Sequence, residues 1–206
     1  MRRPELLARQ AARPSGLLGA LLGRIMAHET AEANRIAVEL LELRPTDSVL
    51  DIGFGHGATV RRLSEIVDRG AVSGIDVSTT MLDLATRRNR DGIRRDRVDL
   101  RVGSVDQLPY PRDAFDAVLS VHTLYFWSEP QRAFAEIRKV LKPAGRLVLG
   151  WRDDPEGRRL FPASVYRFHD ADTVTTMLGG AGMGPTRSFQ HQRGKAILHF
   201  VVAGGG

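Results

Sequence analysis

The sequence predicts an α/β fold in which helices cover both faces of a mostly parallel sheet. Short apolar runs alternate with helical segments, glycines and acids follow several of those runs, and the last two runs have no helix between them. With 206 residues, 42% of them hydrophobic, such a fold can bury its own core. A single domain over residues 1–206 is therefore expected.

The first expected element is a helix over residues 29–43, where apolar side chains recur at helical spacing until Arg44-Pro45. Short apolar runs bounded by Gly, Asp or Ser then predict buried strands at 48–52, 71–75, 98–102, 115–120 and 146–151. Helices are expected between the early strands at about 58–67 and 79–89.

The second half of the chain continues this alternation. Ser128 and Gln131 have capping-box spacing and predict a helix to about Leu141, with Pro130 in its first turn. Residues 143–145 then turn the chain into the fifth strand. The last elements are a helix and a hairpin that gives the sheet an antiparallel edge, at 171–178, 186–191 and 196–202.

Composition excludes several classes of function. The chain has no cysteine, which rules out disulfide scaffolds, cysteine-ligated metals and cysteine nucleophiles. No apolar run approaches the roughly 18 residues of a membrane span, so a cytoplasmic protein without a membrane partner is expected. The basic start and the apolar patch at 16–22 raise the alternative of a secretory signal, which the interruption at Arg24 makes the weaker one.

The net charge of +6 raises the possibility of a nucleic-acid partner. The densest arginine group, residues 87–101, is interleaved with Asp91, Asp96 and Asp99 and contains no aromatic residue for base stacking. A solvated helix face is the favoured interpretation.

The loop after the first strand reads Asp51-Ile52-Gly53-Phe54-Gly55-His56-Gly57. Glycines there allow a tight turn and let a ligand approach the backbone closely. By itself the loop also fits a dinucleotide-binding pattern. It predicts a ligand site without naming the ligand.

Acids near the ends of the first three strands narrow the choice of ligand. Asp51 can meet an ammonium group, and Asp76, 19 residues beyond Gly57, can accept from both hydroxyls of a ribose. Asp106 follows the third strand and can accept from an exocyclic adenine amine. Together the acids suit one cationic ligand that carries adenosine.

In combination these motifs resemble the class I S-adenosylmethionine-dependent methyltransferases, within them the group of the ubiquinone and menaquinone biosynthesis type. The resemblance runs from about Met26 to the last strand and rests on residues 49–57, 74–78 with Met81, 103–109, 115–120 and 141–147. It implies a Rossmann-like, doubly wound sheet of seven strands in the order 3-2-1-4-5-7-6, with strand 7 antiparallel. Asp51 stands where many relatives carry Glu, and His56 replaces a small residue.

The resemblance implies S-adenosylmethionine as cofactor and S-adenosylhomocysteine as product. Asp51, Gly53 and Gly55 would lie beside the methionine half, Asp76 on the ribose, and Val105 with Asp106 on the adenine. The whole expected cofactor set is Asp51, Gly53, Phe54, Gly55, Asp76, Val77, Met81, Ser104, Val105, Asp106 and Ser120. No metal is expected, because the sulfonium already activates the leaving group in an in-line displacement.

Catalytic groups are expected just beyond the fourth strand, where His122 and Tyr125 are the candidate bases, with His28 and Glu29 as second choices. The rings of Phe54, Tyr125, Phe126 and Trp127 could face the sulfonium or a flat acceptor, or belong to the core. The resemblance also suggests that residues 1–45, with Met26, His28 and Asn34, form a helical lid over a core of residues 46–206. Acceptor choice would depend on this lid and on 151–169.

A small-molecule acceptor is the favoured interpretation, and three alternatives stay open. A nucleic-acid methyltransferase lacks support because no Asn/Asp-Pro-Pro-aromatic tetrad follows the fourth strand. Asp51 and Asp106 argue against a nicotinamide-dependent oxidoreductase. A cofactor-binding protein without catalysis is the third. The acceptor atom and the oligomeric state, monomer or homodimer, stay open as well.

Overall fold

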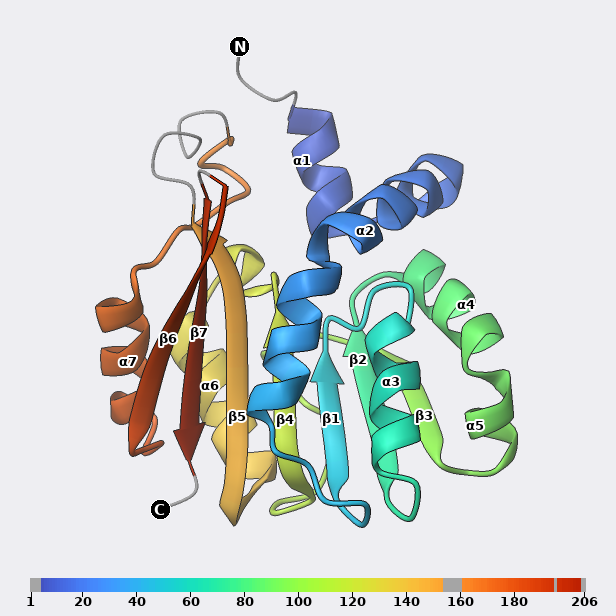
Figure 1. Ribbon diagram of the computed structural model, residues 1–206. Helices are drawn as coiled ribbons and strands as arrows, with labels where there is room; N and C mark the ends of the chain where they lie inside the picture. Colours follow the sequence, from blue (N-terminus) through green and yellow to red (C-terminus); the bar gives the residue numbers. More distant parts are fainter. Residues whose placement is uncertain (1–4, 154–160, 195, 205–206) are drawn as a thin grey trace.

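A seven-stranded sheet forms the centre of the molecule in this computed structural model, with the strand order β3-β2-β1-β4-β5-β7-β6 (Figure 1). The structure describes residues 5–153, 161–194 and 196–204, and for residues 17, 18, 20–29 and 193 it describes the backbone alone. The strands are β1 Ser48–Ile52, β2 Ala71–Asp76, β3 Val98–Val102, β4 Phe115–Val121, β5 Leu141–Asp153, β6 Thr186–Arg193 and β7 Ala196–Gly204.

The strand directions confirm the predicted mixed sheet. Strands β1 to β5 pair in parallel, whereas β7 runs antiparallel to both β5 and β6. The hairpin predicted at the end of the chain therefore forms one edge of the sheet. The carboxyl ends of β1, β2 and β4 meet at the same side of the molecule, where a ligand is expected in such folds.

Helices cover both faces, as Figure 1 shows for α2 and α3 in front of the sheet and α6 behind it. The helical elements are α1 Glu5–Ala12, α2 Gly16–Leu40, α3 Ala58–Ile66, α4 Thr79–Arg88, α5 Arg90–Arg94, the 3-10 turn η1 Leu124–Phe126, α6 Pro130–Val140 and α7 Ala171–Gly180. None of the described helices is long and apolar enough to cross a membrane.

Two hydrophobic cores follow from alternation along the strands. Val148 of β5 packs in the core shared with α2 and α3, whereas its neighbours Leu147 and Leu149 pack with α6 and α7. All three side chains are almost completely buried. A strand covered on both faces needs apolar residues at successive positions, which is the pattern that predicted these strands.

The first helix of the core begins earlier than predicted. Helix α2 starts at Gly16, so the apolar patch at 16–22 is part of a 25-residue helix. A Cβ on Gly19 would lie 2.7 Å from the backbone carbon of Pro14, so this glycine permits the close turn between α1 and α2. Contacts of this kind cannot be read from helical periodicity.

The capping-box prediction at Ser128 and Gln131 is wrong. Helix α6 begins at Pro130 after Glu129, and no side chain caps it. Proline at the first position has no N–H, which removes one of the donors that a cap would satisfy. The helix predicted over 79–89 ends at Arg88, and α5 follows it directly. Asn89 sits at the junction, where its amide donates to the carbonyl oxygens of Gly57 and Ala85.

Strand β5 also starts before its predicted position. Leu141 already pairs with Phe115, and the register then shifts before Arg146 pairs with Ala117. The residues at 142–145 therefore interrupt a strand pairing instead of leading out of a helix.

Candidate functional site

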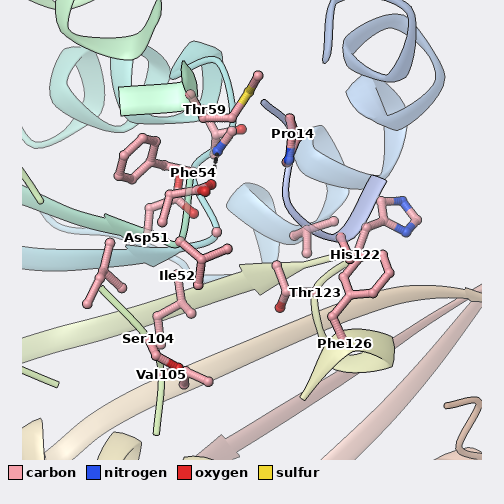
Figure 2. Close-up of a pocket in the computed structure, with 18 of the residues that line it drawn as sticks. Pro14, Asp51, Ile52, Phe54, Thr59, Ser104, Val105, His122, Thr123 and Phe126 are labelled. Carbon is pink, nitrogen blue, oxygen red and sulfur yellow. Dashed lines mark hydrogen bonds between the residues drawn. The ribbon is translucent and has the colours of Figure 1, made fainter. Parts of the chain in front are cut away.

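A pocket of about 290 Å³ lies at the carboxyl ends of the central strands. Figure 2 shows Asp51 and Phe54 on one side of it and Pro14, His122 and Phe126 on the other. Residues of α1 and α2 line part of the pocket. Ten of the expected cofactor residues also line it, namely Asp51, Gly53, Phe54, Gly55, Asp76, Val77, Met81, Ser104, Val105 and Asp106. Of the expected cofactor set, Ser120 alone is outside the lining.

The glycine loop, residues 51–57, has backbone angles at its glycines that other residues could adopt only with strain. Gly53 has φ of +77°, and a Cβ on it would clash with Cγ2 of Thr123. Gly55 has φ of +53°, but its Cβ position is open, with no atom within 4 Å. Gly53 thus lets the loops after β1 and β4 touch, and Gly55 leaves a bare backbone beside the pocket.

Asp76 holds the glycine loop in place from the end of β2. Its Oδ2 accepts from the backbone N–H of Gly55, and its Oδ1 accepts from that of Ser78, each at 2.9 Å. Burial raises the pKa of Asp76, and these hydrogen bonds from backbone N–H groups oppose the rise. The carboxylate retains lone pairs that could accept from ligand hydroxyls.

Asp51 is the most unusual charged group of the site. It is 4% exposed, and its Oδ2 has no hydrogen-bond partner among the described residues. Burial, and secondarily the charge of Asp76, raises the pKa of Asp51 from 3.8 to about 7. A buried carboxylate without a partner is costly, so a cationic group in the pocket would stabilise its charged form.

The loop after β3 offers an apolar wall and an acceptor next to it. Val105 is buried, and the Oγ of Ser104 donates to Oδ2 of Asp106 at 3.0 Å. The other oxygen, Oδ1 of Asp106, is buried without a partner in the described part of the chain. This combination suits a flat heterocycle whose edge carries an amino group.

His122 lines the pocket after β4 in a left-handed backbone conformation, with φ of +60°. Its N–H donates to the carbonyl of Gly150 at 2.7 Å, which fixes the residue against β5. Its Nδ1 lies 2.8 Å from the hydroxyl of Tyr125. Non-glycine residues held in this region are enriched at functional sites because the surrounding structure must maintain the strain.

Tyr125 stands behind His122 and is not part of the pocket lining. Its hydroxyl accepts from the N–H of Arg152 at 2.7 Å and lies 3.2 Å from the carbonyl oxygen of the same residue. Burial raises the pKa of Tyr125 far above its ordinary value. Ser120 does not line the pocket either. Its Oγ donates to the carbonyl of Ile52 and contacts the hydroxyl of Thr123, and Thr123 lines the pocket.

The N-terminal segment closes one side of the pocket. Ala11, Ala12 and Pro14 line it from the α1–α2 region, and Thr30 and Asn34 line it from α2. Sequence patterns predicted Asn34 but missed the alanines and Pro14, because nothing local marks a contact with loops far along the chain. The side chains of Met26, His28 and Glu29 lie outside the described residues.

Two hydrogen bonds attach this segment to the start of α4. The Oγ of Ser78 donates to the carbonyl of Pro14, and the N–H of Gly16 donates to Oγ1 of Thr80 at 3.2 Å. Ser78 also accepts from the N–H of Met81 as the N-cap of α4. The same residue therefore caps a helix and holds the segment that lines the pocket.

Of the four aromatic candidates, Phe54, Phe126 and Trp127 line the pocket and Tyr125 does not. Phe54 and Trp127 are about 95% buried, and Trp127 packs edge-on against Phe134. Phe126 lines the pocket and belongs to a ring cluster with Tyr125 and Tyr166. Phe126 is the most exposed of the three lining rings, which makes it the ring best placed to contact a second ligand.

The carboxylates are the charged groups of the pocket lining among the described residues, with no Lys or Arg to balance them. They belong to Asp51, Asp76 and Asp106. Among the described residues no group of three or more His, Cys, Asp or Glu could hold a metal ion.

Comparison with known proteins relates the chain to a family of enzymes. Residues 50–149 match the family described as methyltransferase domain. Over 184 residues the chain is 30% identical to the demethylmenaquinone methyltransferase of Thermotoga maritima, covering 88% of this chain and 76% of the relative.

Solved structures share the fold at lower identity. A SAM-dependent methyltransferase from Aquifex aeolicus superposes with a TM-score of 0.69 at 23% identity, covering 84% of this chain and 89% of that one. The [4+2]-cyclase SpnF superposes with a TM-score of 0.71 at 22% identity, covering 97% and 92%. These likenesses concern the fold alone.

Proposed function

The chain belongs to the class I S-adenosylmethionine-dependent methyltransferases, and from this premise we propose that it methylates an uncharged small molecule by in-line displacement. The observation that carries the choice of acceptor is the charge of the pocket. Its described lining contains carboxylates and no Lys or Arg, so a phosphate or carboxylate on the acceptor would find no counter-charge there.

In this proposal the cofactor lies across the glycine loop. Asp51 accepts from the ammonium of the methionine half, which neutralises its otherwise unpartnered Oδ2. Asp76 accepts from the ribose hydroxyls, and Asp106 accepts from the adenine amine against the apolar wall of Val105. Ser120 acts one step away by supporting Thr123, the residue that Gly53 touches.

His122 is the proposed base for an acceptor that loses a proton. The methyl group leaves sulfur as the acceptor atom attacks from the opposite side, the sulfonium becomes a neutral thioether, and the acceptor's proton moves to the imidazole. Tyr125 supports this role, because a hydroxyl with so high a pKa keeps its own proton. It positions the ring of His122 through the contact at Nδ1.

The relative from Thermotoga maritima is named for the methylation of demethylmenaquinone. A quinol is uncharged and flat, and the wall formed by Pro14 and Phe126 would suit such a ring. Phenols and quinols are therefore the first acceptors to test.

The test incubates purified protein and S-adenosylmethionine with a panel of phenols, quinols and amines. Each compound is paired with its phosphorylated or carboxylated analogue. Release of S-adenosylhomocysteine is expected with uncharged members and not with their anionic analogues. A chiral methyl group on the cofactor should arrive inverted on the product, as an in-line displacement requires. Faster turnover on an anionic analogue, or salt-sensitive turnover on RNA, would contradict the proposed acceptor class.

A further inference from the structure

The imidazole of His56 is held by two donors on one nitrogen. A guanidinium nitrogen of Arg88 lies 2.7 Å from Nδ1 of His56, and the backbone N–H of Ala58 donates to the same Nδ1 at 3.2 Å. Arginine stays protonated and an amide cannot accept, so Nδ1 must present its lone pair to both. The hydrogen of the neutral ring is then on Nε2.

The surroundings of His56 also favour the neutral ring. Burial and, after it, the positive charge of Arg88 lower the pKa of His56 below its ordinary value. At neutral pH the residue is therefore an uncharged N–H donor with a guanidinium on its far side. Such an N–H group, polarised by a neighbouring cation, is suited to donate a hydrogen bond to a carboxylate or another anionic group.

His56 lines the same pocket as Asp51, between Gly55 and Thr59. Helix α3 begins at Ala58 after Gly57, so the hydrogen bond from Ala58 to His56 comes from the first residue of this helix. The partial positive charge at a helix start therefore lies next to the imidazole of His56. Because the methionine end of the cofactor has its ammonium and its carboxylate on one carbon, a group that binds the carboxylate must lie near Asp51.

We propose that His56 donates a hydrogen bond from Nε2 to the carboxylate of the cofactor's methionine end, with Arg88 as the positioning residue. The proposal rests on the cofactor position given under the proposed function. It assigns to this chain a carboxylate contact at a position where the family commonly has a small residue. It also explains how a lining without Lys or Arg in its described part accommodates an anionic group.

The test measures calorimetric binding of S-adenosylmethionine and of decarboxylated S-adenosylmethionine, which keeps the sulfonium and the ammonium. His56→Ala is expected to weaken binding of the intact cofactor about tenfold or more, the range for hydrogen bonds to charged groups, and to leave the decarboxylated analogue unchanged. His56→Gln keeps an N–H donor at a similar reach and should recover most of the lost affinity.

Arg88 is tested through the ring it positions. Nitrogen NMR of labelled histidine should give the Nε2–H tautomer for His56 in the original protein, and a pH titration should give a higher pKa for His56 in Arg88→Ala, because the charge of Arg88 lowers that pKa. Arg87→Ala removes an exposed arginine next in the chain and should change neither the tautomer nor the affinity.

Three results would overturn the proposal. Equal weakening of both ligands by His56→Ala would mean a general effect on the loop, and a larger loss in Arg88→Ala than in His56→Ala would make Arg88 the binding group. Both results leave the proposed function intact. If the original protein bound neither ligand, the proposed function and this inference would fail together.

Discussion

The hydroxyl of Tyr125 joins His122 to the backbone of Arg152, lying 2.8 Å from Nδ1 of the one and 2.7 Å from the nitrogen of the other. One hydroxyl has one hydrogen, and the carbonyl oxygen of Arg152, at 3.2 Å, can only accept it. All these contacts are satisfied together when Nδ1 of His122 carries a hydrogen and donates to Tyr125. In the proposed mechanism, Nε2 of this tautomer is the nitrogen that takes the proton from the methyl acceptor.

Tyr125→Phe is therefore expected to slow turnover about tenfold to a hundredfold, the range for losing a group that orients a functional histidine. The ring is retained, so its packing with Phe126 and Phe168 should persist. Cofactor affinity should stay unchanged in calorimetry, because Tyr125 does not line the pocket. A variant with unchanged kcat on an acceptor from the panel would remove the positioning role.

Asp51→Asn is expected to weaken cofactor binding and to make it less dependent on pH. In the original protein the carboxylate must lose its proton to pair with the ammonium, so affinity should fall by up to about tenfold per pH unit below its pKa. That pKa is about 7 without ligand. Titration calorimetry in buffers of different ionisation enthalpy should detect a proton released on binding, and the variant should release none.

The same residue affects the stability of the ligand-free protein. Its folded pKa of about 7 exceeds its ordinary value of 3.8, so between these values the folded state binds a proton that the unfolded state lacks. The contribution of Asp51 to the free energy of unfolding is therefore largest at low pH and declines as pH rises towards 7. In urea titrations from pH 5 to pH 7.5, the stability of Asp51→Asn relative to the original protein should rise with pH.

Gly53→Ala and Gly55→Ala form a matched pair within one loop. Both place a side chain on a left-handed backbone, which costs about 1–2 kcal/mol. Gly53→Ala also clashes with Thr123, so its thermal unfolding should occur at a clearly lower temperature than that of Gly55→Ala. Gly55→Ala meets no protein atom and should mainly reduce cofactor affinity. Equal unfolding temperatures would contradict the packing of Gly53 on Thr123.

Ser78→Ala tests the attachment of the N-terminal segment. Loss of an N-cap costs about 0.5–2 kcal/mol, and this variant also loses the bond to Pro14. Amide hydrogen exchange in residues 5–16 should become faster. Asp170→Ala is the control, because Asp170 caps α7 by accepting from the N–H of Thr173 at 2.7 Å. It should lower stability similarly without changing exchange near Pro14.

Sequence reasoning predicted the strands well and the irregular junctions poorly. The run around Val148 is apolar at every position, because both faces of the strand are covered, and this local pattern is sufficient to identify it. The break of α4 at Asn89 depends on a hydrogen bond to Gly57, 32 residues away, which helical spacing does not encode. Strand order came from family resemblance, and the pairings bear it out.

The site residues, too, separate into those that local sequence motifs predicted and those that only contacts between distant segments bring into the pocket. Motifs next to the strands indicated Asp51, Asp76 and Asp106, because a strand end and its loop are neighbours in sequence. Pro14 and Thr123 enter the pocket through contacts between distant segments, and no pattern near either residue marks them. The proposed division of roles between His122 and Tyr125 rests on the hydrogen bonds of the Tyr125 hydroxyl, which only the folded chain shows.

The contact between Gly53 and Thr123 has a consequence for how new acceptor preferences could arise. These two turns are in contact, with no room for a methyl group on Gly53, so a bulkier residue at 123 would displace the turn that we propose for the methionine half of the cofactor. Substitutions at position 123 would therefore change the choice of methyl acceptor and weaken cofactor binding at the same time. Ala11 and Ala12 also line the pocket and take no part in this contact, so larger side chains there are the first changes to test for new acceptor preferences.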